Sequence, residues 1–593
     1  MQIKDKKTIV IGAASSLGLA FSRELLRNGA AIVILVDVEE SIGKSIVDKL
    51  NLEFGKNRTI FLQCDVTKNS EFDATFKKAI SILGGLDILI NNAEVTSEEN
   101  FVKAVDINVT AVIRGSLLAT QQMGRDTGGK GGVIINVSSV AGLQALPNYP
   151  IYSATKHAIV GFSRSFGQPY HYQRTGVRII VLCPEITNTF ESTTSKDSID
   201  LENLECPDFF DSEKDIHSQK VKNIAHGLVY VIRCAQNGSI WVSEEGKPVY
   251  EIQIPDALPM KSKVDNICAP DFKMTDSGTR SRRSSGSEKI KELEEINSIV
   301  AGKNILITGG VGGLGQAFVN HFLQHGVNKI TILDIDKISG MRIASAMDKS
   351  HGKKKLIFIH TDVSKHESNA DAFKEAISAM GNIDIVINNA GILDERRWEK
   401  EIAVNLSGMM SIATLAVEYM SKEKGGRGGI LVNIGQNIDF RWTAQLPVYT
   451  ATKYAILGLS QSLAVKCDFN KTGIRILTLS PGLTETALTI DSPNKLLSRV
   501  MKADFVKNLE QLPIQTPFIV AQGLMTILRF GESGSIWVIE NGSSPHEVFV
   551  PYYRDLRRIY KNNFTVVDTV KVTKGRPIRE VCDNTRTGLM SCA

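Results

Sequence analysis

The chain has 593 residues, more than one hydrophobic core usually fills, so two or more domains are expected. Its 42% hydrophobic and 22% charged content is that of an ordinary globular protein, and a net charge of +5 implies no nucleic-acid partner. No apolar run reaches the roughly 18 residues of a membrane span, and the eight cysteines form no CxxC pair, so we expect no membrane partner, disulfide framework or metal site.

The N-terminal stretch, residues 1–16, reads MQIKDKKTIVIGAASS and passes from a charged opening directly into an apolar run. It has neither the long apolar segment nor the small-residue cleavage site of a secretory signal peptide. With scattered cysteines, this favours a reducing, cytoplasmic location.

Strand-like apolar runs then alternate with helix-length amphipathic segments such as 17–29. Near-continuous apolar runs are typical of parallel strands that are buried on both faces of a sheet. In the first part of the chain these runs are 8–12, 31–37, 59–65, 86–93, 132–139 and 177–184. The alternation predicts an α/β fold with a doubly wound, Rossmann-like parallel sheet.

The same pattern occurs twice, with a constant offset of 297 residues, as in Gly12 and Gly309 or Tyr152 and Tyr449. The chain is therefore a tandem duplication. The intervening sequence includes MTDSGTRSRRSSGSEKIKELEE, which is polar and typical of a flexible linker. We predict a first domain at 1–255, a linker at 256–298, a second domain at 299–550 and a C-terminal tail at 551–593.

A glycine-rich turn in the second unit, ITGGVGGLG, ends at Gly315 between a predicted strand and a predicted helix. Glycines there allow a tight turn and close approach of a pyrophosphate to a helix N-terminus. Asp334, about 20 residues later, can hydrogen-bond the adenosine ribose hydroxyls and repel a 2′-phosphate. Asp37 has the matching place in the first unit, so both units favour NAD over NADP. A purely structural turn followed by a loop acid is the alternative.

The first unit has Ser16 where the second has Gly313. A side chain at this point either weakens pyrophosphate binding or supplies a hydroxyl that bonds the phosphate, and the sequence leaves both open.

Each unit also contains a Tyr followed four residues later by a Lys, in YSATK at 152–156 and YTATK at 449–453. On a helix, residues four apart share one face. The ammonium of Lys156 or Lys453 is therefore expected to lower the pKa of its tyrosine and to make it a proton donor or acceptor near neutral pH. The spacing alone is common by chance.

These motifs, together with TDV at 361–363, NNAG at 388–391 and NVSS at 136–139, occur in an order that resembles the short-chain dehydrogenase/reductase family. Within the family, both units are most similar to the 15-hydroxyprostaglandin dehydrogenases and related insect-type alcohol dehydrogenases. The resemblance covers 5–255 and 301–550. It implies an NAD-dependent oxidoreductase that interconverts a secondary alcohol and its ketone by hydride transfer.

The resemblance also assigns roles. In the first unit Tyr152 would be the acid/base, Lys156 would hold the nicotinamide ribose, Ser139 would bond the substrate oxygen, and Asn108 would seat a relay water. The second unit has Asn405, Tyr449 and Lys453, with Gln436 where the serine is expected. The implied NAD-binding set is Gly12, Ser16, Leu17, Gly18, Asp37, Asp65, Val66, Asn92, Tyr152 and Lys156 in the first unit, and Gly309, Gly313, Leu314, Gly315, Asp334, Asp362, Val363, Asn389, Tyr449 and Lys453 in the second.

Three departures separate the units. Glu94 and Glu185 of the first stand where the second has Gly391 and Gly482, and Gln436 replaces the catalytic serine. The first unit thus keeps the catalytic set but has an altered cofactor site. The second unit keeps the cofactor site but has an altered catalytic set. From sequence, the first unit is expected to perform the chemistry and the second to hold NAD. The alternative is a non-catalytic NAD(H)-binding scaffold.

The expected partner is a small-molecule alcohol or ketone. Family members pair through two long helices per subunit. Here the corresponding segments are 101–124 with 152–167, and 398–422 with 449–466. We therefore predict that the two units dock as an intramolecular pseudo-dimer, since a linker of this length keeps them at high effective concentration.

Overall fold

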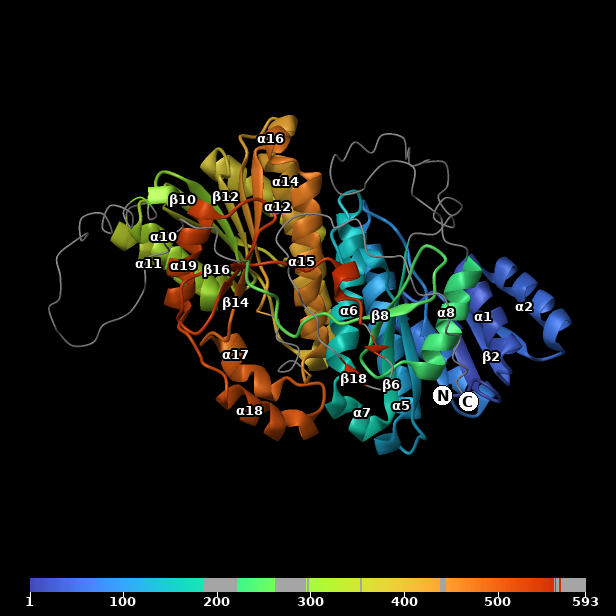
Figure 1. Ribbon diagram of the computed structural model, residues 1–593. Coiled ribbons are helices and arrows are strands. Elements are labelled where there is room, and N and C mark those ends of the chain that lie inside the picture. Colours follow the sequence, from blue (N-terminus) through green and yellow to red (C-terminus); the bar gives the residue numbers. More distant parts are fainter. Residues whose placement is uncertain are drawn as a thin grey trace.

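The computed structural model describes residues 1–185, 221–261, 295, 298–351, 355–437, 444–558, 560–561 and 565–566. Two units of similar architecture lie side by side (Figure 1), each an eight-stranded sheet covered by helices on both faces. This confirms the predicted pair of Rossmann-like α/β domains. Most of the predicted linker, residues 262–294, lies outside the described part of the chain.

The first sheet has the strand order β3-β2-β1-β4-β5-β6-β7-β8, and only β8 runs antiparallel to its neighbour. The strands are β1 Lys7–Ile11, β2 Ile32–Asp37, β3 Thr59–Gln63, β4 Ile88–Asn91, β5 Gly132–Val137, β6 Val177–Pro184, β7 Ile240–Ser243 and β8 Tyr250–Ile252. The chain reverses direction across the sheet between β1 and β4, which opens a crevice at the carboxyl ends of the strands.

The helices of the first domain form one layer on each face of its sheet. They are α1 Ser16–Arg27, α2 Glu40–Phe54, α3 Asn69–Leu83, α4 Phe101–Val105, α5 Ala111–Met123, α6 Pro150–Phe166, α7 Pro169–Thr175 and α8 Val221–Cys234. One core cluster joins α1, α2 and α8 to one face of the sheet, and a second joins α3, α5 and α6 to the other.

The second domain repeats this plan, with strand order β11-β10-β9-β12-β13-β14-β15-β16. Its strands are β9 Asn304–Thr308, β10 Lys329–Asp334, β11 Leu356–His360, β12 Ile385–Asn388, β13 Gly429–Ile434, β14 Ile474–Pro481, β15 Ile536–Ile539 and β16 His546–Val548. Its helices are α10 Gly313–Gln324, α11 Lys337–His351, α12 His366–Met380, α13 Trp398–Ile402, α14 Met409–Met420, α15 Pro447–Lys466, α16 Phe469–Thr472, α17 Ala487–Asp491, α18 Lys502–Glu510 and α19 Pro517–Phe530.

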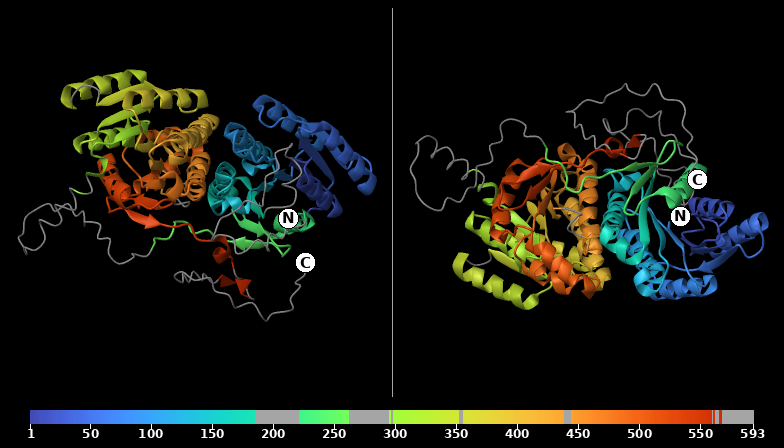
Figure 2. Two further views of the ribbon diagram at one scale, coloured as in Figure 1. Left: turned by 90° about the horizontal axis from the view of Figure 1, so that it is seen from above. Right: turned by 60° about the horizontal axis from the view of Figure 1, so that its bottom comes forward.

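The domains meet along α6 and α15, which lie side by side in Figures 1 and 2. Glycines allow the two helices to approach closely. A Cβ added to Gly161 would lie 2.7 Å from the Cβ of Tyr454, and one added to Gly458 would lie 2.4 Å from the His157 ring. Every residue of α6 is buried, so this helix is a core element of the whole molecule and not of one domain.

Polar contacts extend the interface on both sides of the helix pair. The Arg114 guanidinium lies 2.7 Å from the Glu399 carboxylate, and the Leu146 N–H donates to the Ser462 hydroxyl over 3.0 Å. One hydrophobic cluster contains residues of both sheets. The structure thus shows the two units docked through the helices that the sequence had indicated.

The domains also exchange short arms beyond their last strands. Met260 of the first domain forms a β-bridge with Val548 of the second, and Ile252 forms one with Arg557. The predicted division at 551 therefore needs correction. Residues 551–558 do not leave the fold as a tail, because they pack on the first domain.

The continuous helical run Glu395–Met420 is long and apolar enough to cross a membrane by length and composition alone. In its most apolar window, however, 72% of the residues are buried inside the protein. The run includes α13 and α14, which belong to the domain core, and this accounts for its hydropathy.

We expect Gly458→Leu to lower the free energy of unfolding by about 1–3 kcal/mol or more, because the added side chain must displace the His157 ring. Thermal unfolding measures the loss, and small-angle scattering, which should give one compact particle for the wild type, reports whether the domains separate. The matched control is Lys49→Leu, which places the same side chain at an exposed position. Equal stability of the two variants would contradict the close helix packing.

Candidate active site

A cavity of about 550 Å³ opens at the carboxyl ends of the second domain's parallel strands. At one end it is lined by Gly309, Gly312, Gly313, Leu314, Asp334, Asp362, Val363 and Asn389, in the middle by Gly391, Gln436, Tyr449 and Lys453, and at the other end by Leu393, Leu446, Leu488, Phe505, Leu509 and Leu512. One continuous space thus joins the predicted cofactor residues to the predicted catalytic pair.

The glycine turn at the start of α10 has the geometry that the sequence suggested. Gly309 and Gly313 have φ values of +65° and +54°, a region that favours glycine. A Cβ on Gly315 would lie 2.0 Å from the Gly309 carbonyl oxygen, so only glycine permits the helix to pack on the turn. Gly315 and Asn405 are the predicted site residues of this domain that do not line the cavity.

The predicted acidic site residues of this domain accept hydrogen bonds from neighbouring loop residues. The Asp334 carboxylate accepts a hydrogen bond from the Val311 N–H at 3.0 Å, and the Asp362 carboxylate accepts one from the Ser364 hydroxyl at 2.7 Å. The Asn389 side chain donates to the Gly309 carbonyl at 3.1 Å. These bonds hold the turn and the two loops around one end of the cavity.

Tyr449 and Lys453 lie on the first turns of α15 and are both buried. The Lys453 ammonium donates to the Ile434 carbonyl at 3.1 Å and lies 5.6 Å from the centre of the tyrosine ring. Opposite them stands Gly391, at which a Cβ would lie 3.7 Å from the Lys453 Nζ. The glycine therefore leaves space next to the ammonium.

The expectation that the lysine lowers the tyrosine pKa is wrong for both domains. Burial raises the pKa of Tyr449 above its ordinary value, and the nearby Glu401 carboxylate raises it further. Burial also lowers the pKa of Lys453 to about 8, although Glu401 opposes this shift. Desolvation, which penalises both charged forms, outweighs the attraction between them.

Asn405 lies in a π-helical segment, η8 Ala403–Gly408, and Asn108 lies in the corresponding segment η1 Asp106–Thr110. The Asn405 amide accepts from the Ile392 N–H and donates to the Ile392 carbonyl, each at 2.8 Å. Asn108 makes the same pair of bonds to Val95. Both side chains therefore fix the loop after β4 or β12, and the water relay stays a prediction.

A feature that we did not predict is a carboxylate cap on each catalytic helix. Glu395 accepts hydrogen bonds from the N–H groups of Val448 and Tyr449 at 3.2 and 2.9 Å. Glu98 does the same for the N–H groups of Ile151 and Tyr152. Burial raises the pKa of both acids, that of Glu395 to about 8, and each side chain acts here as a hydrogen-bond acceptor for the helix N-terminus. The two acids are also 297 residues apart, which is the signal that could have identified them.

The far end of the cavity is apolar, and its hydrophobic cluster packs against a residue of the first domain. Tyr170 of α7 packs against the cluster that contains Leu446 and Phe505. The neighbouring His171 ring contacts the Ala444 carbonyl at 2.5 Å. Since α7 belongs to the first domain, the apolar cluster behind this cavity is packed from both domains, whereas the cavity-lining residues all belong to the second.

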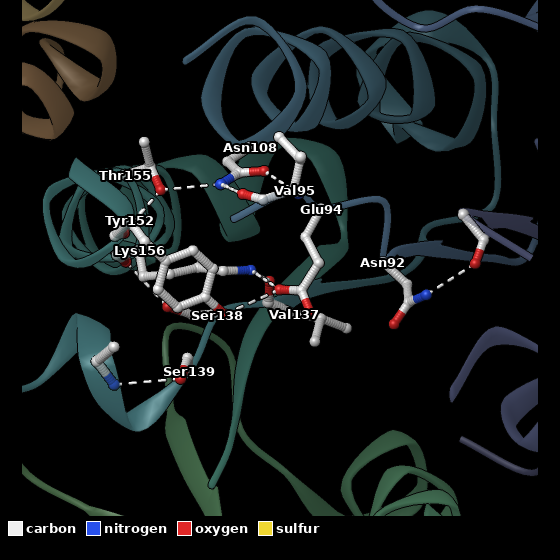
Figure 3. Close-up of polar contacts among 12 residues, drawn as sticks. Asn92, Glu94, Val95, Asn108, Val137, Ser138, Ser139, Tyr152, Thr155 and Lys156 are labelled. Carbon is white, nitrogen blue, oxygen red and sulfur yellow. Dashed lines mark hydrogen bonds and ion pairs between the residues drawn. The ribbon is translucent and has the colours of Figure 1, made fainter. Parts of the chain in front are cut away.

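In the first domain, the corresponding position beside the lysine is filled. The Glu94 carboxylate lies 2.5 Å from the Lys156 ammonium and accepts a hydrogen bond from the Tyr152 hydroxyl at 3.1 Å. Figure 3 shows the glutamate pointing between these two side chains. Burial raises the pKa of Tyr152 well above its ordinary value, and Glu94 adds to the rise, whereas Ser139 opposes it.

The predicted cofactor residues of the first domain also form hydrogen bonds within and between their own loops. Gly12 has φ +79°, and the Asn92 side chain donates to its carbonyl at 2.9 Å. Asp37 accepts from the Ala14 N–H at 2.8 Å. Asp65 accepts from the Thr67 hydroxyl at 2.7 Å, and this bond lowers the pKa of Asp65.

The two domains thus differ in their fit to a dinucleotide. In the second domain, glycines leave open space beside the α10 N-terminus and beside Lys453. In the first domain, Glu94 stands between Lys156 and Tyr152, where the resemblance places the nicotinamide ribose. The second domain leaves space for a dinucleotide, whereas in the first the place beside Lys156 is taken by Glu94.

Comparison with known proteins matched a family model described as short chain dehydrogenase at residues 6–199 and again at 303–496. The chain is 37% identical over 267 residues to 15-hydroxyprostaglandin dehydrogenase [NAD(+)] of Macaca fascicularis. The aligned region covers 44% of this chain and 99% of the relative. The Homo sapiens enzyme of the same name is 36% identical over the same coverage.

Among solved structures, the C-domain of a bacterial malonyl-CoA reductase with NADP superposes with a TM-score of 0.60 at 13% identity, covering 90% of this chain and 96% of that one. The N-domain of a bacterial malonyl-CoA reductase with NADP gives a TM-score of 0.58 at 15% identity, covering 83% and 94%. At such identities the likeness shows the fold alone.

Proposed function

Because this chain belongs to the short-chain dehydrogenase family, we propose that it is an NAD-dependent oxidoreductase that interconverts a secondary alcohol and its ketone. The observation that carries the proposal is the cavity that joins Asp334 and the α10 turn to Tyr449 and Lys453. The NAD-linked relatives support the same cofactor.

We assign the reaction to the second domain, which reverses the assignment made from sequence. The intact Asn-Ser-Tyr-Lys set had favoured the first domain, but there Glu94 engages both Tyr152 and Lys156. A catalytic pair that is bonded to a neighbouring carboxylate is not available to a ribose or a substrate.

In the second domain the chain supplies orientation and proton transfer, while bound NAD would supply hydride acceptance and return. The α10 turn would hold the pyrophosphate, Asp334 the adenosine ribose, and Lys453 the nicotinamide ribose. Tyr449 exchanges a proton with the substrate oxygen. The Gln436 amide lines the same space and would donate a hydrogen bond to that oxygen in place of the missing serine.

The raised pKa of Tyr449 determines the protonation state of this side chain and so the step that it can perform. A phenol that keeps its proton near neutral pH is the form that donates to a ketone oxygen.

The apolar far end, with Leu446, Phe505 and Leu509, would take the hydrocarbon part of the substrate. A panel of apolar ketones and secondary alcohols with NADH or NAD tests the proposal, and no turnover of any member by folded protein would refute it.

We expect Tyr449→Phe to reduce turnover by about 10²–10⁴-fold, since it removes the proton donor. Tyr152→Phe is the matched variant in the other domain and should retain most of the activity. Steady-state rates with the same substrate measure both, and circular dichroism confirms the fold. Loss of activity in Tyr152→Phe alone would return the reaction to the first domain.

We expect NAD to bind at least about tenfold more tightly than NADP, because the Asp334 carboxylate would repel a 2′-phosphate. Isoleucine follows this aspartate, so no cation directly beside it offsets the repulsion. Asp334→Asn should narrow the preference while it keeps an acceptor oxygen for the Val311 N–H. Titration with both dinucleotides measures the ratio, and equal affinities in the wild type would contradict the role of Asp334.

We expect NAD affinity to fall about tenfold between pH 7 and pH 9, since the pKa of Lys453 is about 8 and the charged form holds the ribose. Below pH 7 the ammonium is almost fully charged, so affinity should change little there. Calorimetric titration across this range measures the effect, and Lys453→Ala should bind weakly without the step. An affinity that is constant to pH 9 would exclude this role for Lys453.

A further inference from the structure

Building on the proposed function, we infer that the first domain is closed to the dinucleotide by its own side chains, so that each chain binds one NAD, in the second domain. Three places carry the inference. At each, the second domain has a cavity-lining glycine, namely Gly312, Gly391 or Gly482, and the first domain has a polar side chain at the same offset, namely Ser15, Glu94 or Glu185.

The first place is the helix N-terminus at which a pyrophosphate would bind. The Ser15 hydroxyl accepts a hydrogen bond from the Gly18 N–H at 3.0 Å and donates to the Gly12 carbonyl at 2.9 Å. One of the N–H groups that would face the phosphate is thereby already bonded. In the second domain Gly312 provides no side-chain cap, and a Cβ there would meet no atom within 4 Å.

The second place is the catalytic pair. Lys156 is 2% exposed and has the Glu94 carboxylate at 2.5 Å, while the Tyr152 hydroxyl donates to the same carboxylate oxygen (Figure 3). A buried lysine is stabilised by such a partner, and removal of the partner leaves an uncompensated charge. To bind the lysine, a ribose would have to displace a carboxylate that two groups already hold.

The third place is the turn after β6. The Glu185 carboxylate accepts from the Glu245 N–H at 3.0 Å, and Arg554, from the arm that follows the second domain, lies 3.9 Å from it. The same Arg554 guanidinium contacts Glu244 and Glu245 at 3.1 and 3.2 Å. Arg554 of the second domain's arm therefore helps to hold the Glu185 carboxylate at this edge of the first domain's crevice.

The three contacts involve different elements, and the contact of Glu94 engages the tyrosine and lysine whose counterparts line the second domain's cavity. They make the first domain a folded partner that needs no cofactor to neutralise Lys156. The second domain has only the Ile434 carbonyl as a bonding partner for Lys453 among the described residues, and burial lowers the pKa of that lysine.

The test is the number of NAD molecules bound per full-length chain, measured by isothermal titration calorimetry and independent of turnover. The wild type should bind one. Gly391→Glu, which places the first domain's carboxylate beside Lys453, should bind none. The reciprocal triple variant Ser15→Gly, Glu94→Gly and Glu185→Gly should bind two, and Glu94→Gly alone should gain a second, weaker site.

Two NAD molecules per wild-type chain would overturn the inference and leave the proposed function standing. One NAD bound by folded Gly391→Glu would overturn it as well, and this result does not depend on whether the triple variant folds. A folded triple variant that still binds one would show that these side chains do not close the site. If the wild type bound none and the triple variant one, closure would stand and the proposed function would fail.

Discussion

The rest of the molecule depends on the close crossing of α6 and α15. Two glycines bring these helices together, and a Cβ on Gly161 would lie 3.2 Å from the carbonyl of Thr450, the residue after the catalytic Tyr449. The helix turn that carries Tyr449 is therefore in direct contact with the first domain. We expect the position of Tyr449 to depend on this packing.

This dependence gives the first domain a role that requires no chemistry of its own. A packed partner must be stable without a ligand, and the ion pair of Glu94 with buried Lys156 supplies a charge balance within the fold. The second domain has the opposite arrangement, with a glycine beside Lys453 and open space in front of it. Duplication on one chain thus allows one copy to become self-sufficient while the other keeps a site that favours an anionic or polyhydroxyl ligand.

Much of this could be predicted from sequence. The apolar runs predicted the parallel strands, since strands buried on both faces are near-continuously apolar, and the constant offset predicted the two domains. Gly309, Gly313 and Asp334 line one cavity, as expected from the glycine turn and the strand that precedes the aspartate, and their roles in cofactor binding stay a prediction. Such features depend on neighbours in sequence or on a repeated pattern.

The features that were missed depend on long-range packing. Glu94 was recognised as a departure, but its contact with Lys156 requires the loop after β4 to face α6, which spacing does not show. The pKa of Tyr449 was predicted in the wrong direction, because a sequence reports the nearby lysine and not the depth of burial. The expected division of labour remains untested, and our proposal reverses it because an intact motif does not reveal which side chain lies beside it.

At the edge of the molecule, the exchanged arms also supply groups that one domain needs from the other. Glu185, Glu244 and Glu245 gather at one end of the first sheet, and carboxylates this close repel one another unless a cation lies among them. Arg554 supplies that cation, and Tyr553 donates to Glu244 at 2.7 Å. Both come from the chain that leaves the second domain. The first domain is therefore completed by the second at this edge, just as Tyr170 of the first domain packs against the apolar cluster behind the second domain's cavity.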